Sequence, residues 1–301
     1  MRPGENLSVR GDRRYDAPEG ERELAPFAPV PEHLRGGVVR SVALPPGKKL
    51  IALTFDLCEV RGEVAGYDGA IIDTLRANSI KATFFAGGKW MRSHAERAGQ
   101  LMSDPLFEIA NHSEAHRNLR LLEGRDLSEE ILGAQRSYER LRGGLGAAAC
   151  VSKTASGLGA IPPRLALFRF PFGACSPASL AAVNDAGLVA VQWDLSTGDP
   201  SPAVSARAIA EAMVRGAKPG SIIILHANGR GWHTADALPD AIPRLKAKGF
   251  EFVTVSELLS AGRPEVVPTC YDNRPGDTDK YDMLFLAKHH GRAKRNGTLS
   301  R

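Results

Sequence analysis

Short apolar segments alternate with longer amphipathic ones along most of this chain, and that alternation restricts the folds it can adopt. Apolar runs of strand length begin near residue 50 and recur as far as residue 255, with segments of helical character between them. Near-continuous apolar strands are buried on both faces, as they are in parallel sheets covered by helices. The pattern therefore predicts an α/β fold built on a parallel sheet or barrel.

The apolar runs, together with the residues that interrupt them, predict where the elements lie. The expected strands cover residues 50–55, 82–85, 107–110, 166–170, 188–193, 221–226 and 250–255. The expected helices cover residues 68–78, 95–102, 126–142, 177–185, 204–215 and 237–248. A Gly-, Ala- and Ser-rich stretch at residues 143–159 indicates a surface loop.

The length of 301 residues suits one large core, and we expect a single folded domain at residues 46–262. Residues 1–45 are rich in proline, glycine and charge, which predicts a wrapping or flexible arm. Residues 263–301 are polar and basic, and we expect a C-terminal tail without a core of its own.

Composition narrows the range of partners. Apolar residues make up 43% of the chain and charged residues 24%, as in ordinary globular proteins. The net charge of +5 lies partly in the basic stretch 288–295, but no aromatic-basic face accompanies it, so we expect no nucleic-acid partner. No apolar run is long enough to cross a membrane, and no protein partner is readable. The N-terminus lacks the apolar core of a signal peptide, which favours the cytoplasm, or an extracytoplasmic location if a leader is missing from this chain.

The four cysteines are too few for a disulfide scaffold, and their simplest interpretation is four buried thiols. Cys58 and Cys175 each closely follow a candidate site residue. Their thiols would be neighbours if both segments bordered one site, and the sequence leaves their pairing open.

Two histidines four residues apart, His112 and His116, are the first indication of a metal site. Neutral imidazole is a good ligand for zinc and similar first-row cations, and a catalytic site needs about three protein ligands. An isolated pair of this spacing is more often polar loop residues. Here the pair gains weight because Asp56, Arg169 and His226 also lie at strand ends, where barrels of this kind carry their chemistry.

These residues fall into motifs whose order resembles that of the polysaccharide deacetylases, the family that includes the chitooligosaccharide deacetylases of nodulation. The resemblance extends over residues 49–259. It implies a single distorted (β/α) barrel that holds a divalent metal and removes acetyl groups from N-acetylated or O-acetylated sugars. The motifs are Thr54-Phe55-Asp56, His112-Ser113-x-x-His116, Arg169-x-Pro171-Phe172-Gly173, Trp193 through Asp199, and Leu225-His226.

The resemblance also implies roles for the charged residues. Asp56 matches the carboxylate base that deprotonates the attacking water, and His226 matches the acid that protonates the leaving group. Arg169 matches the arginine that pairs with the base, although a purely structural ion pair would look the same from sequence.

The same resemblance implies how the acetyl group is held. The backbone N–H of Phe172 would face the oxyanion. Trp193 and Leu225 would form an apolar wall for the acetyl methyl group, and a core role for both is equally compatible with the sequence.

The first motif departs from the family, which has a second, metal-binding aspartate where this chain has Leu57. Asp56 could bind the metal itself, Glu59 could reach in from the same loop, or water could fill the place. We rank Asp56 first and Glu59 second as the third ligand beside His112 and His116. Zinc is the expected metal, with cobalt or nickel as alternatives.

The fourth motif departs as well, because Ser196 stands where the family usually has an aspartate, and Asp199 follows it. Asp199 either orients His226 or caps the helix expected to begin near residue 204.

Two other functions compete with a deacetylase. One is hydrolysis of a non-sugar C–N bond, as in allantoinase- and imidase-like relatives, and the other is glycan binding without catalysis. Retention of Asp56, Arg169 and His226 favours the deacetylase. The sugar, its chain length, and N- against O-deacetylation are not readable from the sequence.

Overall fold

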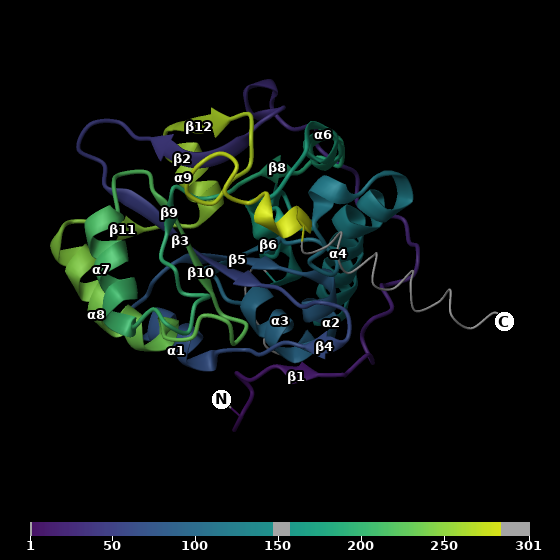
Figure 1. Cartoon of the computed structure of the whole chain (residues 1–301), viewed down its shortest axis with the longest axis horizontal. Coiled ribbons are helices and arrows are strands. Elements are labelled where there is room, and N and C mark those ends of the chain that lie inside the picture. Colours follow the sequence, from purple (N-terminus) through teal and green to yellow (C-terminus); the bar gives the residue numbers. More distant parts are fainter. Residues whose placement is uncertain (1, 147–156, 284–301) are drawn as a thin grey trace.

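The computed structural model describes residues 2–146 and 157–283. Most of the predicted loop at residues 143–159 and the basic stretch at residues 288–295 lie outside these ranges. Within them, the strands form a curled sheet with helices on its outer side (Figure 1).

The central sheet runs in the order β8-β7-β6-β5-β3-β10-β9, and β11 also pairs with β3. Every pairing in it is parallel. This confirms the predicted α/β architecture and its distorted barrel. The strands are β3 (Leu50–Leu57), β5 (Ala82–Ala86), β6 (Phe107–Asn111), β7 (Leu167–Phe168), β8 (Val189–Ala190), β9 (Leu195–Ser196), β10 (Ile222–His226) and β11 (Glu251–Phe252).

Some of the helices begin where a side chain accepts a hydrogen bond from one of their first N–H groups. Asp68 accepts from the N–H of Ala70 at the start of α1, and Ser176 closes a capping box at the start of α6. The helices are α1 (Gly69–Ala77), α2 (Gly88–Ser93), α3 (Ala95–Met102), α4 (Gly124–Leu145), α6 (Pro177–Asp185), α7 (Ala206–Gly216), α8 (Thr234–Ala247) and α9 (Val255–Ala261). Short 3-10 turns lie at η1 (Glu32–Leu34), η2 (Leu119–Leu121), η3 (Gly157–Ala160) and η4 (Pro171–Gly173).

Most predicted elements are present, and the differences have local causes. The expected helices at residues 95–102 and 177–185 match α3 and α6. The strand predicted at residues 250–255 ends at Phe252, because Thr254 forms a capping box that starts α9. The sequence did not predict α2, and α4 runs three residues into the expected loop. Among the described residues, no helix has the length and apolarity needed to cross a membrane.

Strand alternation divides the sheet residues between two environments. In β3, Leu53, Phe55 and Leu57 belong to the main apolar cluster that packs against the helices. The alternate residues face the interior of the barrel, where Ala52 belongs to a second apolar cluster. Asp56 follows this interior row and ends it with a carboxylate.

The two segments flanking the predicted barrel pair with each other. The predicted arm contains β2 (Val38–Ala43), which forms an antiparallel sheet with β12 (Arg263–Val267) of the predicted tail. β2 also bridges to Val191 beyond β8 and to Ser221 before β10, so it links distant parts of the curled sheet. Nearer the N-terminus, β1 (Val9–Arg10) pairs with β4 (Glu63–Val64). The arm and the start of the tail are therefore integral to the fold.

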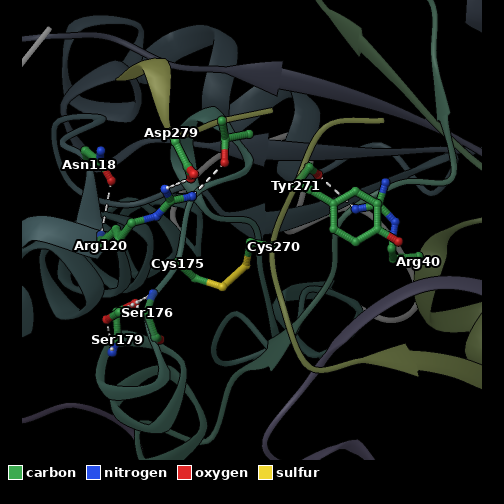
Figure 2. The surroundings of a disulfide bond; sticks show 10 residues. Arg40, Asn118, Arg120, Cys175, Ser176, Ser179, Cys270, Tyr271 and Asp279 are labelled. Atoms are coloured by element: carbon green, nitrogen blue, oxygen red, sulfur yellow. Dashed lines mark hydrogen bonds and ion pairs between the residues drawn. A yellow bond between two sulfur atoms is a disulfide. The ribbon is translucent and has the colours of Figure 1, made fainter. Parts of the chain in front are cut away.

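Beyond β12, residues 268–283 form a segment that we call the C-terminal strap. A disulfide joins Cys270 of the strap to Cys175, which follows η4 (Figure 2). The Arg40 guanidinium donates to the carbonyl of Tyr271 at 2.8 Å and lies 3.6 Å from the centre of its ring. The disulfide corrects the interpretation of four thiols: Cys175 pairs with Cys270, and Cys58 is a free, buried cysteine.

Candidate active site

The predicted site residues meet at one end of the barrel because their strands are parallel. Asp56 lies near the end of β3, and His226 ends β10 in direct register with it. His112 follows β6 and Arg169 follows β7. The carboxyl ends of parallel strands share one edge of the sheet, which is where barrels of this type hold their chemistry.

Asp56 and Arg169 form a buried ion pair. The guanidinium Nη1 donates to Asp56 Oδ1 at 2.8 Å, and the two side chains are almost fully enclosed. Arg169 also donates to the carbonyl of Gln192 and lies 3.9 Å from the centre of the Phe85 ring. Burial opposes the charge on Asp56, but its positively charged neighbours, Arg169 among them, outweigh it and lower the pKa of this carboxyl. Asp56 is therefore an oriented carboxylate at neutral pH.

His112 and His116 present unpartnered nitrogens to the same space. His112 Nδ1 lies 2.9 Å from the carbonyl oxygen of Arg169, and because a carbonyl can only accept, Nδ1 carries the proton. His112 Nε2 is left with its lone pair, 3.3 Å from Asp56 Oδ2. His112 Nε2 and His116 Nδ1 are both buried without a hydrogen-bond partner among the described residues. Burial lowers the pKa of both rings, which keeps them neutral and able to bind a cation.

The loop between the two histidines is held in an unusual backbone conformation. Ser113 and His116 have φ angles of 65° and 52°, in the left-handed region that side chains disfavour. Asn111 Oδ1 accepts from the N–H of Ser113, and Ser113 Oγ accepts from the N–H of His116. These bonds compensate for the strain and turn His116 back toward His112, whose ring centre is 4.9 Å away.

Cys58 completes the group around this space, although the sequence did not identify it as a ligand. Its sulfur and one nitrogen each from His112 and His116 all lie within 4.8 Å of one another. Two imidazoles and a thiol are ligands that suit a divalent cation of the zinc type, and each imidazole has a buried nitrogen without a hydrogen-bond partner among the described residues. Burial raises the pKa of the Cys58 thiol to about 12, so without a cation this sulfur is protonated.

Glu59, the second-ranked ligand, points elsewhere. Its Oε1 accepts from Lys89 Nζ at 2.7 Å, and its Oε2 accepts from Ser93 Oγ and from the N–H of Ala65. Both oxygens are thus engaged in a buried network with Lys89, which is itself fully enclosed.

His226 has a different partner from the other two histidines. Its Nδ1 lies 2.9 Å from Asp199 Oδ1, while Asp199 Oδ2 accepts from the N–H of His226 and from Thr234 Oγ1. Burial favours the neutral ring, but the charge and hydrogen bond of Asp199 outweigh it and raise the pKa of His226. Asp199 therefore contacts His226, as one prediction proposed. The capping alternative is wrong, because Ser205 caps α7.

Phe172, the predicted oxyanion residue, occupies the left-handed region with φ 61° in the tight turn η4. Its ring centre lies 4.4 Å from that of His116 and 5.1 Å from that of Tyr281 in the strap. The η4 turn and the strap therefore both border the metal-binding side of the site.

The two residues predicted to form the apolar wall differ in position. Trp193 belongs to the interior cluster, and its Nε1 donates to Asp272 of the strap at 3.0 Å. Leu225 is fully buried and belongs to the cluster that packs against the helices. Because strand residues alternate, Ile224 rather than Leu225 shares a face with His226. Placement thus favours the core role for Leu225, and the alternation within β10 is the signal that sequence reasoning missed.

Comparison with known proteins agrees with this geometry. The family model described as polysaccharide deacetylase matches residues 43–191. A peptidoglycan-N-acetylglucosamine deacetylase of Bacillus cereus is 30% identical, with 72% of this chain and 91% of that protein covered. A chitooligosaccharide deacetylase of Sinorhizobium fredii is 28% identical, over 68% of this chain and 89% of that one.

The fold has a matching counterpart among solved structures. That of the Bc1960 peptidoglycan N-acetylglucosamine deacetylase superposes with a TM-score of 0.59 at 27% identity, covering 75% of this chain and 94% of that one. The extent of the sequence match and the shared barrel lead to one conclusion: the chain belongs to the polysaccharide deacetylase family.

Proposed function

We propose that this protein is a metal-dependent deacetylase that removes acetyl groups from the N-acetylated sugars of an oligosaccharide or polysaccharide. One observation carries the proposal. The register of β3 and β10 sets Asp56 directly beside His226, with His112 Nε2 adjoining Asp56 and His116 adjoining His112. A carboxylate and a protonated imidazole beside a cation site are what hydrolysis of an acetamide requires.

His112 and His116 would hold the cation, and zinc suits their neutral nitrogens, with cobalt or nickel as alternatives. When bound, a divalent cation supplies Lewis-acid polarisation of the acetyl carbonyl. The chain contributes the remaining polar contact to that oxygen through the backbone N–H of Phe172, in line with its position beside His116.

Asp56 and His226 would move the protons. Asp56, held in its charged form by Arg169, accepts a proton from the water that attacks the acetyl carbon. His226, charged through its contact with Asp199, gives its proton to the sugar nitrogen as the C–N bond breaks. The products are acetate and a free amino sugar, so one water is consumed in each turnover.

The interior face offers an apolar surface for the acetyl methyl group. Trp193 is held by its hydrogen bond to Asp272, and Ile224 lies on the face of β10 that carries His226. Both are apolar and almost fully buried, which suits contact with a small methyl group.

The disulfide bears on where the enzyme works. Disulfides such as Cys175–Cys270 form and persist mainly in oxidising compartments outside the cytoplasm. The disulfide therefore supports the extracytoplasmic location, one of the two that the sequence left open, and this location suits a substrate in a cell wall or another external glycan.

Acetate release by metal-stripped protein tests the function. The substrates are N-acetylchitopentaose and fragments of peptidoglycan, with zinc, cobalt or nickel added back singly. We expect release that depends on added metal. No release from either glycan, together with hydrolysis of cyclic amides, would replace the proposal with a non-sugar hydrolase. Glycan affinity unchanged by chelator, without any turnover, would replace it with a binding protein.

A further inference from the structure

The sulfur of Cys58 lies beside the two metal-binding histidines, in a chain that lacks the carboxylate its family uses there. We infer that Cys58 is the third protein ligand of the metal, which makes the site a two-histidine, one-thiolate centre. This inference deepens the proposed function and rests on the metal site within it.

The distances permit three bonds to one ion. Cys58 Sγ and the facing nitrogens of His112 and His116 lie within 4.8 Å of one another. Zinc binds nitrogen at about 2.0 Å and thiolate sulfur at about 2.3 Å, so neighbouring ligands of a tetrahedral ion lie about 3.3 to 3.8 Å apart. Small side-chain rotations would therefore bring all three donors to bonding distance, and the fourth position would stay open for substrate.

Strand alternation explains why the ligand is residue 58 rather than residue 57. Side chains two residues apart point to the same side of an extended chain, so Cys58 follows Asp56 toward the interior. Leu57 points the opposite way and is fully buried in the cluster against the helices. An apolar residue at position 57 is therefore a core residue, and the ligand function moves one residue along the chain.

The competing carboxylates have other partners. Asp56 Oδ1 accepts from Arg169, and neither oxygen of Asp56 joins the group of mutually close ligand atoms found among the described residues. Glu59 is held by Lys89 and Ser93. Assigning the third bond to Cys58 leaves Asp56 free to act only as the base.

Asn228 holds the sulfur in place. Its Nδ2 donates to Cys58 Sγ at 3.1 Å and to the carbonyl oxygen of Cys58 at 2.8 Å. Asn228 is fully buried, and Cys58 is only 3% exposed. A hydrogen-bond donor on the sulfur is the kind of contact that orients a metal ligand and stabilises its thiolate form. A thiol that only fills space in the core does not require such a hydrogen bond.

The donor set has a chemical consequence. Cation binding releases the thiol proton to solvent, so the ligand contributes one negative charge, as the family's aspartate would. Thiolate and imidazole favour zinc and cobalt over magnesium, calcium or manganese, which prefer oxygen ligands. The site should therefore discriminate between these groups of metals more sharply than a site with a carboxylate ligand.

The test is the ligand environment of the metal in the full-length protein with its disulfide intact. X-ray absorption of the zinc form is expected to contain one sulfur at about 2.3 Å. The cobalt(II) form is expected to show a thiolate-to-cobalt charge-transfer band in the near ultraviolet. Cys58→Ser should remove both signals and weaken zinc binding by more than the roughly 10- to 100-fold caused by loss of an outer contact.

Glu59→Gln and Asp56→Asn are the matched controls, and both should retain the sulfur signals. A zinc site without sulfur in the wild-type protein would overturn the inference, even if acetate is released. Loss of the metal in either control, with zinc binding unchanged in Cys58→Ser, would assign the bond to that carboxylate instead. Sulfur-ligated zinc without acetate release would support the ligand and refute only the proposed function, so the two failures are distinguishable.

Discussion

The two histidines proposed to bind the metal and the histidine proposed as the acid lie in one site, yet their pKa values are shifted in opposite directions. Burial favours the neutral form of His112, His116 and His226 alike. The partner of Nδ1 makes the difference for two of them: a backbone carbonyl holds His112, whereas the Asp199 carboxylate holds His226. A neutral ring can bind a cation, and a charged ring can give up a proton.

The neighbourhood of Asp56 sharpens this contrast. Asp56 Oδ2 lies only 3.3 Å from His112 Nε2 and would by itself favour a charged ring. Burial is the largest influence on His112, so the pKa of its ring remains lowered, and the positive charge of Arg169 acts in the same direction. Arg169 also pairs with Asp56 and keeps this carboxylate ionised.

The largest effect should follow from removing one of the two neutral histidines. His112→Ala deletes a ligand that no neighbouring side chain can replace, and we expect loss of both bound metal and acetate release. Metal content by elemental analysis and turnover by acetate assay measure the two effects. His33→Ala, which removes an exposed histidine far from these residues in sequence, is the control. Full metal content in His112→Ala would remove this residue from the site.

Asp56→Asn separates the base from the metal ligands. The amide keeps a hydrogen-bond acceptor for Arg169 but cannot accept the proton of water, and we expect turnover to fall by about 10²- to 10⁴-fold. Metal content should remain, because the inferred ligands are Cys58 and the two histidines. If metal and activity disappear together, Asp56 is a ligand, as the first-ranked sequence prediction has it.

His226→Ala tests the proposed role of the charged histidine as the general acid. Loss of a general acid should slow turnover by roughly 100-fold or more, while the metal stays bound. The amine of an N-acetylated sugar is a poor leaving group unless it is protonated, whereas the alcohol of an activated acetyl ester leaves without a proton. The variant should therefore lose less activity on the ester than on the sugar. Equal losses on both substrates would argue against His226 as the acid.

Much of the barrel and of the site could be predicted from the sequence because both depend on local patterns. Apolar runs located the strands, and Asp56, Arg169 and His226 could be predicted as site residues because each lies at or just past a strand end. Asp199 was left between two roles, since only the path of the chain determines whether it reaches His226 or a helix N-terminus.

The strap and the role of Cys58 were not predicted, for two different reasons. Cys175 and Cys270 are 95 residues apart, and spacing alone does not determine which cysteines pair. Cys58 was considered as one of four thiols and as a possible neighbour of Cys175, and not as a metal ligand. Its position two residues after Asp56 already indicated the same side of the chain, so the alternation of β3, continued one residue beyond the strand, could have identified it.

Asp199→Asn should give the smallest effect and the most direct test of why the histidines differ. The pKa of His226 is raised, so in the wild-type protein its proton is present to higher pH and the acid function is lost as pH rises through that value. Without the carboxylate charge, burial remains and lowers the pKa of this ring. The alkaline limb of the kcat/KM profile should therefore move to lower pH, so that activity falls mainly under alkaline conditions.

The acid limb should move less in Asp199→Asn, because Asp56 keeps its ion pair with Arg169 and loses only part of the positive charge of His226. Asp240→Asn, which removes an exposed carboxylate paired with Arg244 on α8, controls for the general loss of negative charge. An unchanged alkaline limb would mean that the Asp199 contact positions His226 without setting its charge. The contrast between the histidines would then have a cause other than the charge of the carboxylate that holds His226.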